Sequence, residues 1–175
     1  MEIAQAKELY RYLKSFPLFS YLNEDAMIDL FKSGRVIECD TQRRVIKEGQ
    51  VQPEIYLVAR GSVDVTVQEG GREVFISTIG EGQFFGEAGL FTRVRRTANV
   101  LASDGTLLIA IGRPAFLAFI QKWPKTGMQL LLLIIYNLLK KLRSVNQELA
   151  FERKFDIDQE DIDDIIRGIL EEKGE

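Results

Sequence analysis

A short segment near the middle of the chain, residues 84–100, combines residue types that could bind a phosphorylated sugar. It reads FFGEAGLFTRVRRTANV. Residues 87–90 suit one turn of helix, whose first backbone N–H groups have no partner within the helix and point at whatever lies ahead. Such a helix start together with Arg96 favours a phosphate. The carboxylate of Glu87 suits phosphate poorly but accepts a hydrogen bond from a sugar hydroxyl, so the pair indicates a phosphorylated ribose.

The segment resembles the phosphate-binding cassette of cyclic-nucleotide-binding domains. These domains occur in bacterial catabolite activators, protein kinase A regulatory subunits and cyclic-nucleotide-gated channels. The family pattern is an aromatic or aliphatic residue, Gly-Glu, any residue, Ala or Gly, Leu, a short loop, and then Arg, a small residue, Ala, any residue and Val. The matching residues are Phe85, Gly86, Glu87, Gly89, Leu90, Arg96, Thr97, Ala98 and Val100. The match is specific, because Arg-Thr-Ala follows Gly-Glu at a spacing of nine residues within a strand-like run.

The resemblance implies a role for each residue of the cassette. Arg96 pairs with the exocyclic phosphate, Glu87 accepts from the ribose 2′-OH, and the N–H groups of Gly89 and Thr97 complete the phosphate cradle. The residues expected to bind the ligand are Phe85, Gly86, Glu87, Ala88, Gly89, Arg96, Thr97 and Ala98. The residues alone leave an alternative, a structural pair in which Glu87 and Arg96 bridge to each other. Arg95 is expected to face solvent, because side chains alternate along a strand.

The ligand implied by the resemblance is cyclic AMP or cyclic GMP, bound without a metal. The hydroxyl of Thr97 could bond a purine edge, but a hydroxyl at this position does not decide between the two nucleotides. The base is expected to be capped by the long helix near the end of the chain. The candidate capping residues are Lys141, Val145 and Asn146.

The composition argues against an enzyme. The 175 residues are 46% hydrophobic and 28% charged, which is typical of one soluble globular core with short appendages. The chain contains no histidine, so the usual general base and the commonest transition-metal ligand are missing. One cysteine and no signal-peptide pattern predict a cytoplasmic location. The longest apolar run, 130–136, is far below the roughly 20 residues that span a bilayer, so no membrane span is expected.

The first part of the chain, residues 1–34, has apolar residues at helical spacing. We predict one amphipathic helix over 3–15 and a second that begins after the N-cap Asn23 and ends at Gly34.

From residue 35 the period of the apolar residues changes to two. Residues 35–123 contain short β-branched or aliphatic runs separated by glycine-containing turns, of which Gly70-Gly71 suits a two-residue hairpin. This pattern predicts a sandwich or a barrel. The family resemblance implies a mainly β fold with flanking helices, an eight-stranded jelly roll.

A long helix is predicted over residues 124–152. Its apolar residues alternate by three and four, as in a coiled-coil seam. The seam consists of Met128, Leu131, Ile135, Leu138, Leu142, Val145 and Leu149. Other leucines widen the apolar face, so the first turns could pack on the sandwich while the later ones meet a partner. In relatives of the catabolite-activator type this helix forms the dimer interface, and we expect a homodimer through 128–149.

The last segment, 153–175, is acidic. Counted from Glu152, it holds ten acidic and four basic residues, a net charge of −6. Its apolar residues, from Ile162 to Leu170, line one side of a short amphipathic helix. This helix could dock on its own domain or bind a partner protein. DNA binding is not expected, because acidic residues repel DNA and the helix-turn-helix of catabolite activators is missing.

These features favour a stand-alone cyclic-nucleotide-binding regulatory module that signals by movement of its C-terminal helices. The alternative is a dimerisation or protein-interaction module of the same fold that does not bind nucleotide.

Overall fold

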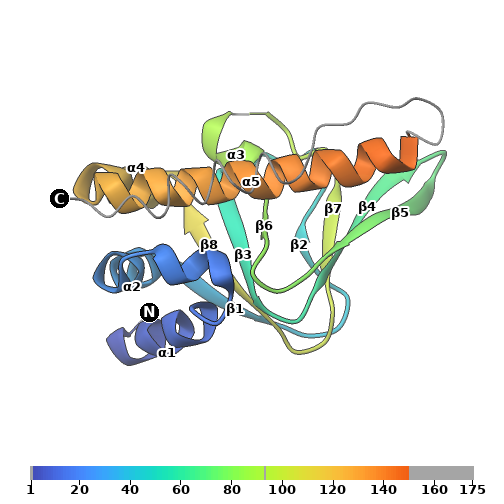
Figure 1. The fold of residues 1–175 in the computed structure, drawn as a ribbon. Coiled ribbons are helices and arrows are strands. Elements are labelled where there is room, and N and C mark those ends of the chain that lie inside the picture. The colour runs from blue at the N-terminus through green and yellow to red at the C-terminus, as the bar shows by residue number, and fades with distance from the viewer. Residues whose placement is uncertain (1, 93, 150–175) are drawn as a thin grey trace.

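Eight antiparallel strands form two four-stranded sheets (Figure 1). The computed structural model describes residues 2–92 and 94–149. The strand orders are β1-β8-β3-β6 in one sheet and β2-β7-β4-β5 in the other, which agrees with the predicted jelly roll. The strands are β1 (Arg35–Cys39), β2 (Arg43–Ile46), β3 (Glu54–Arg60), β4 (Val63–Glu69), β5 (Arg72–Ile79), β6 (Phe84–Phe85), β7 (Asn99–Ala102) and β8 (Thr106–Gly112).

Strand β3 is buried on both faces and joins two hydrophobic cores. Tyr56 and Val58 pack between the sheets against residues such as Val100 of the other sheet. Ile55 and Leu57 point to the opposite face, where they pack on the helices. A strand covered on both sides reads as a continuous apolar run, which explains why this segment lacks an alternating pattern.

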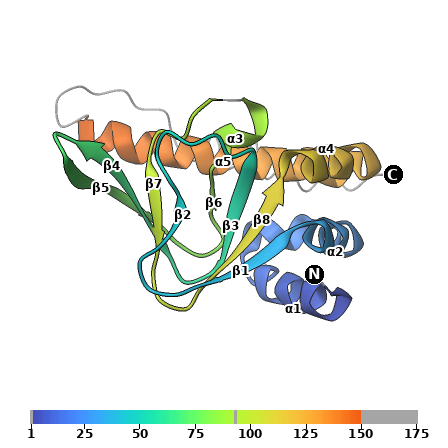
Figure 2. The ribbon, with the colours of Figure 1, turned by 180° about the vertical axis from the view of Figure 1, so that it is seen from behind.

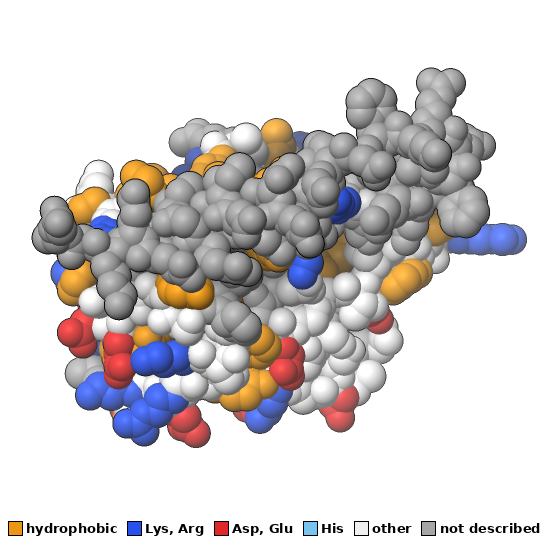
Figure 3. Space-filling model, viewed as in Figure 1, with side chains coloured by type: hydrophobic (Ala, Val, Ile, Leu, Met, Phe, Trp, Pro, Cys, Tyr) orange, Lys and Arg blue, Asp and Glu red, His pale blue; other side chains and the backbone are white. Residues whose placement is uncertain are grey.

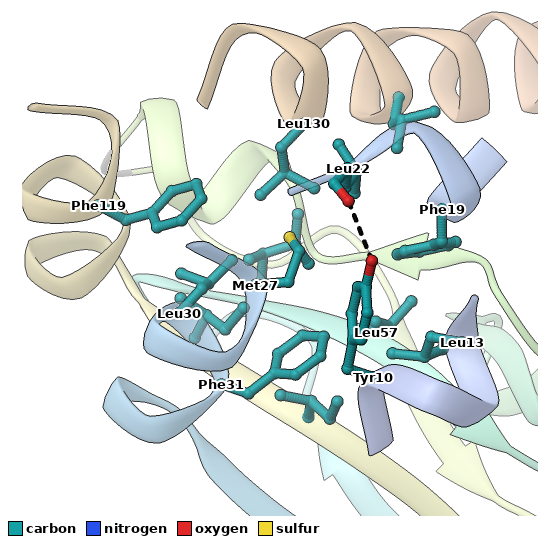
Figure 4. Packing of buried hydrophobic residues seen from close by; sticks show 14 of the residues in the cluster. Tyr10, Leu13, Phe19, Leu22, Met27, Leu30, Phe31, Leu57, Phe119 and Leu130 are labelled. Carbon is teal, nitrogen blue, oxygen red and sulfur yellow. Dashed lines mark hydrogen bonds between the residues drawn. The ribbon is translucent and has the colours of Figure 1, made fainter. Parts of the chain in front are cut away.

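Helices cover the outer face of the sheet that contains β3 (Figures 1 and 2). They are α1 (Ile3–Leu13), α2 (Glu24–Ser33), α4 (Arg113–Lys122) and α5 (Pro124–Leu149), with a 3-10 helix η1 (Pro17–Tyr21) and the short α3 (Ala88–Phe91). Figure 4 shows Phe31 of α2, Phe119 of α4 and Leu130 of α5 in the core that they share. The buried Tyr10 hydroxyl donates to Leu22 O at 3.0 Å, so the polar group of this core residue is satisfied.

The two N-terminal helices agree with their predictions. Asn23 Oδ1 accepts a hydrogen bond from the N–H of Ala26 at 3.0 Å, and Gly34 follows the last residue of α2. Figure 3 shows acidic and basic side chains interspersed over the lower part of the face that contains α1 and α2. This mixture is typical of the solvent face of amphipathic helices.

Helix α4 was not predicted, because residues 35–123 were assigned to the jelly roll as a whole. The strand β8 ends at Gly112, and ten helical residues follow it. Pro114 lies in the first turn, where its missing N–H is tolerated, and Phe116 and Phe119 are buried at helical spacing. The proline and this spacing are the signals that could have revealed the helix.

Helix α5 does not divide along its length as its sequence suggested, since Met128 near its start is exposed while the seam residue Leu138 packs against the domain core. Leu130, Leu133 and Ile134 are each 1% exposed and pack on the domain. The seam residues Met128, Ile135 and Leu142 are 62%, 49% and 57% exposed. The apolar face is therefore wider than the part that the domain covers. Among the described residues, no helix has the length and apolar character needed to cross a membrane.

Candidate functional site

A cavity of about 650 Å³ lies between the β2-β7-β4-β5 sheet, the segment 84–100 and helix α5. This size is within the range of small-molecule sites. All eight residues that the sequence predicted for ligand binding, from Phe85 to Ala98, line it together with Lys141. Among the described residues, its charged lining consists of one acid, Glu87, and five bases, Arg95, Arg96, Lys140, Lys141 and Arg143. The cavity therefore favours an anion.

The cassette is fixed to the fold by two apolar anchors. The Phe85 ring stacks on Tyr56, with centroids 5.0 Å apart and an angle of 10° between the rings. Leu90, in α3, is buried in the helix-side core. Between these anchors Gly86 turns the chain with a φ of +76°, a conformation that favours glycine. Glu87 then has helical dihedral angles and precedes the first residue of α3.

Arg96 lies at the wall of this cavity and is 8% exposed. Its Nη1 donates to Gly86 O at 2.7 Å, and its Nη2 donates to Glu54 O at 2.6 Å. Burial lowers the pKa of this guanidinium from its ordinary value, while Tyr56 and Glu87 oppose that shift. An arginine still remains charged at neutral pH. The hydrogen bonds orient the guanidinium, but neutral carbonyl groups do not balance its charge.

The alternative of a Glu87–Arg96 ion pair is wrong. Among the described residues, no carboxylate oxygen lies within 4.0 Å of the Arg96 guanidinium. Glu87 pairs instead with Lys141 of α5, whose Nζ lies 3.0 Å from Glu87 Oε1. A buried cation without an adjacent carboxylate is costly unless another anion approaches it. The pairing therefore leaves Arg96 available for a ligand.

Two glycines make room for the Arg96 guanidinium. A Cβ at Gly86 would lie 2.9 Å from Arg96 Nη1. A Cβ at Gly89 would lie 2.9 Å from the same nitrogen and 2.5 Å from Gln52 O. All three distances are too short for a methyl group, so the position of the arginine requires glycine at both positions.

The backbone N–H groups differ in part from the expected phosphate cradle. The Gly89 N–H donates to Gly86 O at 3.0 Å, within the turn that opens α3. Thr97 is exposed and Ala98 is half-buried at the cavity. Arg95 is exposed as expected, and its Nη1 donates to Gly49 O at 2.8 Å.

The structure places one of the three candidate base-capping residues. Lys141 reaches the cavity, but its ammonium also donates to Phe84 O at 2.6 Å, so it lies on the cassette. The side chains of Val145 and Asn146 lie outside the described residues, as does the acidic segment 153–175. Their roles stay predictions.

The sequence analysis missed Arg113, which holds the end of α3. Its Nη2 donates to Gly89 O at 2.9 Å and also to Thr92 O. Cations stabilise the carboxyl end of a helix, where the carbonyl groups lack partners. It also missed the cavity wall formed by β5, which contributes Ile76, Ser77, Thr78 and Ile79. No local motif marks either feature, because each depends on the packing of distant segments.

Comparisons with known proteins identify the family of this domain. Residues 36–122 match the model of the cyclic nucleotide-binding domain family. The "cAMP-dependent protein kinase type II regulatory subunit" of Drosophila melanogaster is 33% identical over 98 residues, which are 56% of this chain and 26% of that protein. The "cGMP-dependent protein kinase, isozyme 2 forms cD5/T2" of the same organism is 34% identical over 111 residues, 60% of this chain and 12% of that protein. The chain thus spans about a quarter of the first relative and about an eighth of the second.

A solved structure extends the likeness to the fold. The catabolite activator protein of Thermus thermophilus has a TM-score of 0.63 and 27% identity, and the match covers 77% of this chain and 62% of that chain. The predicted jelly roll with flanking helices is therefore confirmed. Residues 36–122, with a cassette built around Glu87 and Arg96, belong to the cyclic nucleotide-binding domain family.

Proposed function

We propose that the cavity binds cyclic AMP or cyclic GMP and that the ligand regulates the position of helix α5. The observation that carries this proposal is the guanidinium of Arg96, buried beside the cavity and hydrogen-bonded only to carbonyl oxygens among the described residues. A cyclic phosphodiester carries one negative charge, which one arginine can balance. Arg96 is the proposed phosphate ligand, and Glu87 is the proposed acceptor for the ribose 2′-OH.

The cavity's lining suits the remainder of such a ligand. Val65, Ile79 and Val100 form an apolar wall on the sheet side, opposite the charged side chains of α5. A nucleotide combines an apolar purine face with a charged phosphate, so it matches a wall of this mixed kind. The two kinase-related relatives carry cAMP and cGMP in their names, one each. These names support the class of ligand and do not decide the base.

Signalling is proposed to proceed through α5. This helix contributes Lys140, Lys141 and Arg143 to the cavity, and its buried residues pack on the domain core. A ligand that contacts the cassette and the helix together favours the arrangement in which both lie in place. The ligand then shifts the population toward that arrangement without any chemical step.

The exposed side of α5 supports a homodimer. Met128, Ile135 and Leu142 follow one another at seven-residue intervals, and about half or more of each residue is exposed to solvent. A second copy of α5 would cover this stripe. Sedimentation of the wild-type chain is expected to give a dimer at tens of micromolar, and Ile135→Glu is expected to give a monomer. A wild-type monomer at that concentration would contradict this part of the proposal.

Calorimetric titration with cyclic AMP and cyclic GMP tests the binding itself. Arg96→Ala is expected to weaken binding by at least tenfold, because a hydrogen bond to a charged group contributes about 1.5–3 kcal/mol. Arg72→Ala is the matched control, since Arg72 is an exposed arginine that is not among the residues lining the cavity. Its effect is expected to stay below about threefold. Failure of the wild type to bind either nucleotide would favour the interaction module without a ligand.

A further inference from the structure

We propose that Lys141 is a positioning residue, which orients the Glu87 carboxylate toward the ribose and ties helix α5 to the cassette. The ribose part rests on the proposed function, whereas the contacts themselves do not. Lys141 Nζ donates to Glu87 Oε1 at 3.0 Å and to Phe84 O at 2.6 Å. Glu87 and Lys141 are separated by 54 positions in the chain, so this ammonium joins two distant elements.

The environment of the pair makes these contacts effective. The Lys141 and Glu87 side chains are 32% and 14% exposed, so solvent screens their attraction less than at an open surface. The second acceptor, Phe84 O, belongs to strand β6 and does not move with the glutamate. The Lys141 ammonium is therefore fixed by two acceptors, Phe84 O and Glu87 Oε1, and it in turn holds the Glu87 carboxylate in one orientation.

This arrangement leaves the other carboxylate oxygen for a ligand. Oε1 of Glu87 accepts from Lys141, and among the described residues no hydrogen bond is formed by Oε2. An ionised carboxylate has about four acceptor sites, so it can accept from a hydroxyl while it keeps its lysine. A carboxylate that is already oriented loses little rotamer freedom when the hydroxyl binds. Lys141 thereby strengthens the contact between Glu87 and the ribose hydroxyl, although Lys141 itself does not touch the hydroxyl.

The same geometry links the ribose to α5. Lys141 can hold Glu87 in place only while the helix that carries it lies over the cassette. A ligand whose 2′-hydroxyl binds Glu87 therefore stabilises that position of the helix, and the helix in that position increases the affinity for the hydroxyl. A ligand without the hydroxyl lacks this coupling.

A cycle of ligand and residue changes tests the ribose part. Cyclic AMP and cyclic GMP, each with its 2′-deoxy counterpart, are titrated into wild type, Lys141→Met, Lys141→Arg and Lys125→Met. In wild type the missing hydroxyl is expected to weaken binding by about tenfold or more. In Lys141→Met this penalty is expected to fall below about threefold, and Lys141→Arg is expected to restore most of it. Lys125, an exposed lysine at the start of α5 that does not line the cavity, is the control and should keep the wild-type penalty. Equal penalties in wild type and Lys141→Met would overturn the assignment.

A second measurement, without nucleotide, tests the tie to α5. Amide hydrogen exchange across residues 134–143 is compared in wild type, Lys141→Met, Glu87→Gln and the double variant. Both single variants are expected to exchange faster than wild type, because each of them removes the Lys141–Glu87 ion pair. The double variant is expected to exchange no faster than Lys141→Met, because it removes the same pair. Unchanged exchange in Lys141→Met would overturn the tie. If wild type binds neither nucleotide, the proposed function and the ribose part both fail, while hydrogen exchange still decides the tie.

Discussion

Replacement of Gly89 by alanine is the sharpest test of the way in which the cassette holds its arginine. The added Cβ would lie 2.5 Å from Gln52 O and 2.9 Å from both terminal nitrogens of Arg96. The carbonyl belongs to the backbone and the guanidinium is fixed by two hydrogen bonds, so neither can yield without breaking contacts. The backbone angle at Gly89 itself is not in the left-handed region, so the effect comes from the collision alone.

The size of the effect follows from this collision. Overpacking a filled site costs typically about 1–3 kcal/mol of unfolding free energy. For a chain of this size, about 2–4 °C of melting temperature corresponds to each kcal/mol, so Gly89→Ala should lower Tm by roughly 2–12 °C. Because Arg96 must move, affinity for the cyclic nucleotide should fall by about tenfold or more. Scanning calorimetry measures the first quantity and isothermal titration the second.

Gly80→Ala is the matched control for this substitution. A Cβ at Gly80 meets nothing within 4 Å, and its φ is not in the left-handed region. Its unfolding free energy is expected to stay within about 0.5 kcal/mol of wild type. If Gly89→Ala melted and bound nucleotide like Gly80→Ala, the proposed packing of the guanidinium against Gly89 would be refuted.

Three further predictions concern the helices that support the site. Asn23→Ala removes the N-cap of α2 and should cost about 0.5–2 kcal/mol in chemical denaturation, whereas Asn23→Asp should retain most of the stability. Tyr10→Phe leaves the buried Leu22 carbonyl without its donor and should cost about 1 kcal/mol by the same measurement, and no change would mean that the carbonyl finds another donor. Hydrogen bonds from Lys122 and Trp123 hold the pKa of Asp29 below its ordinary value of 3.8, with burial opposing them. The ionised Asp29 therefore contributes its full stability above pH 3.8, and this contribution is lost as the pH falls through the lower pKa of the folded state. When the unfolding free energy is measured from pH 6 to 2.5, it should fall less in Asp29→Asn than in wild type.

The features that could be predicted from the sequence are those whose cause is local. Asn23 and Gly34 bound α2 because caps depend on neighbouring backbone groups. The hairpin between β4 and β5 follows from Gly70-Gly71, whose φ angles of +57° and +81° are accessible to glycine. The cassette could be predicted for the same reason, since Gly86, Glu87 and Arg96 lie within one continuous segment.

The features that were missed depend on contacts between distant segments. Arg96 reaches the carbonyl of Glu54, 42 positions away, and Arg113 reaches that of Gly89, 24 positions away. Helix α4 is the exception, because it was missed in spite of local signals. It follows strand β8 directly, so its apolar residues were assigned with those of the strand, although Pro114 and the helical spacing of Phe116 and Phe119 indicate a helix.

Three cations connect the cassette with other parts of the domain. Arg96 holds Gly86 O before α3, Arg113 of α4 holds Gly89 O within α3, and Lys141 of α5 holds Glu87 between them. We propose that a ligand that moves Glu87 and the turn into α3 changes the contacts that Lys141 and Arg113 make from α5 and α4. Because α4 and α5 pack in one core with α2, we expect such a change to displace the packed helices. In this proposal the cassette connects the sheets with the helices, and the contacts of Arg113 and Lys141 determine how tightly α4 and α5 are held to it.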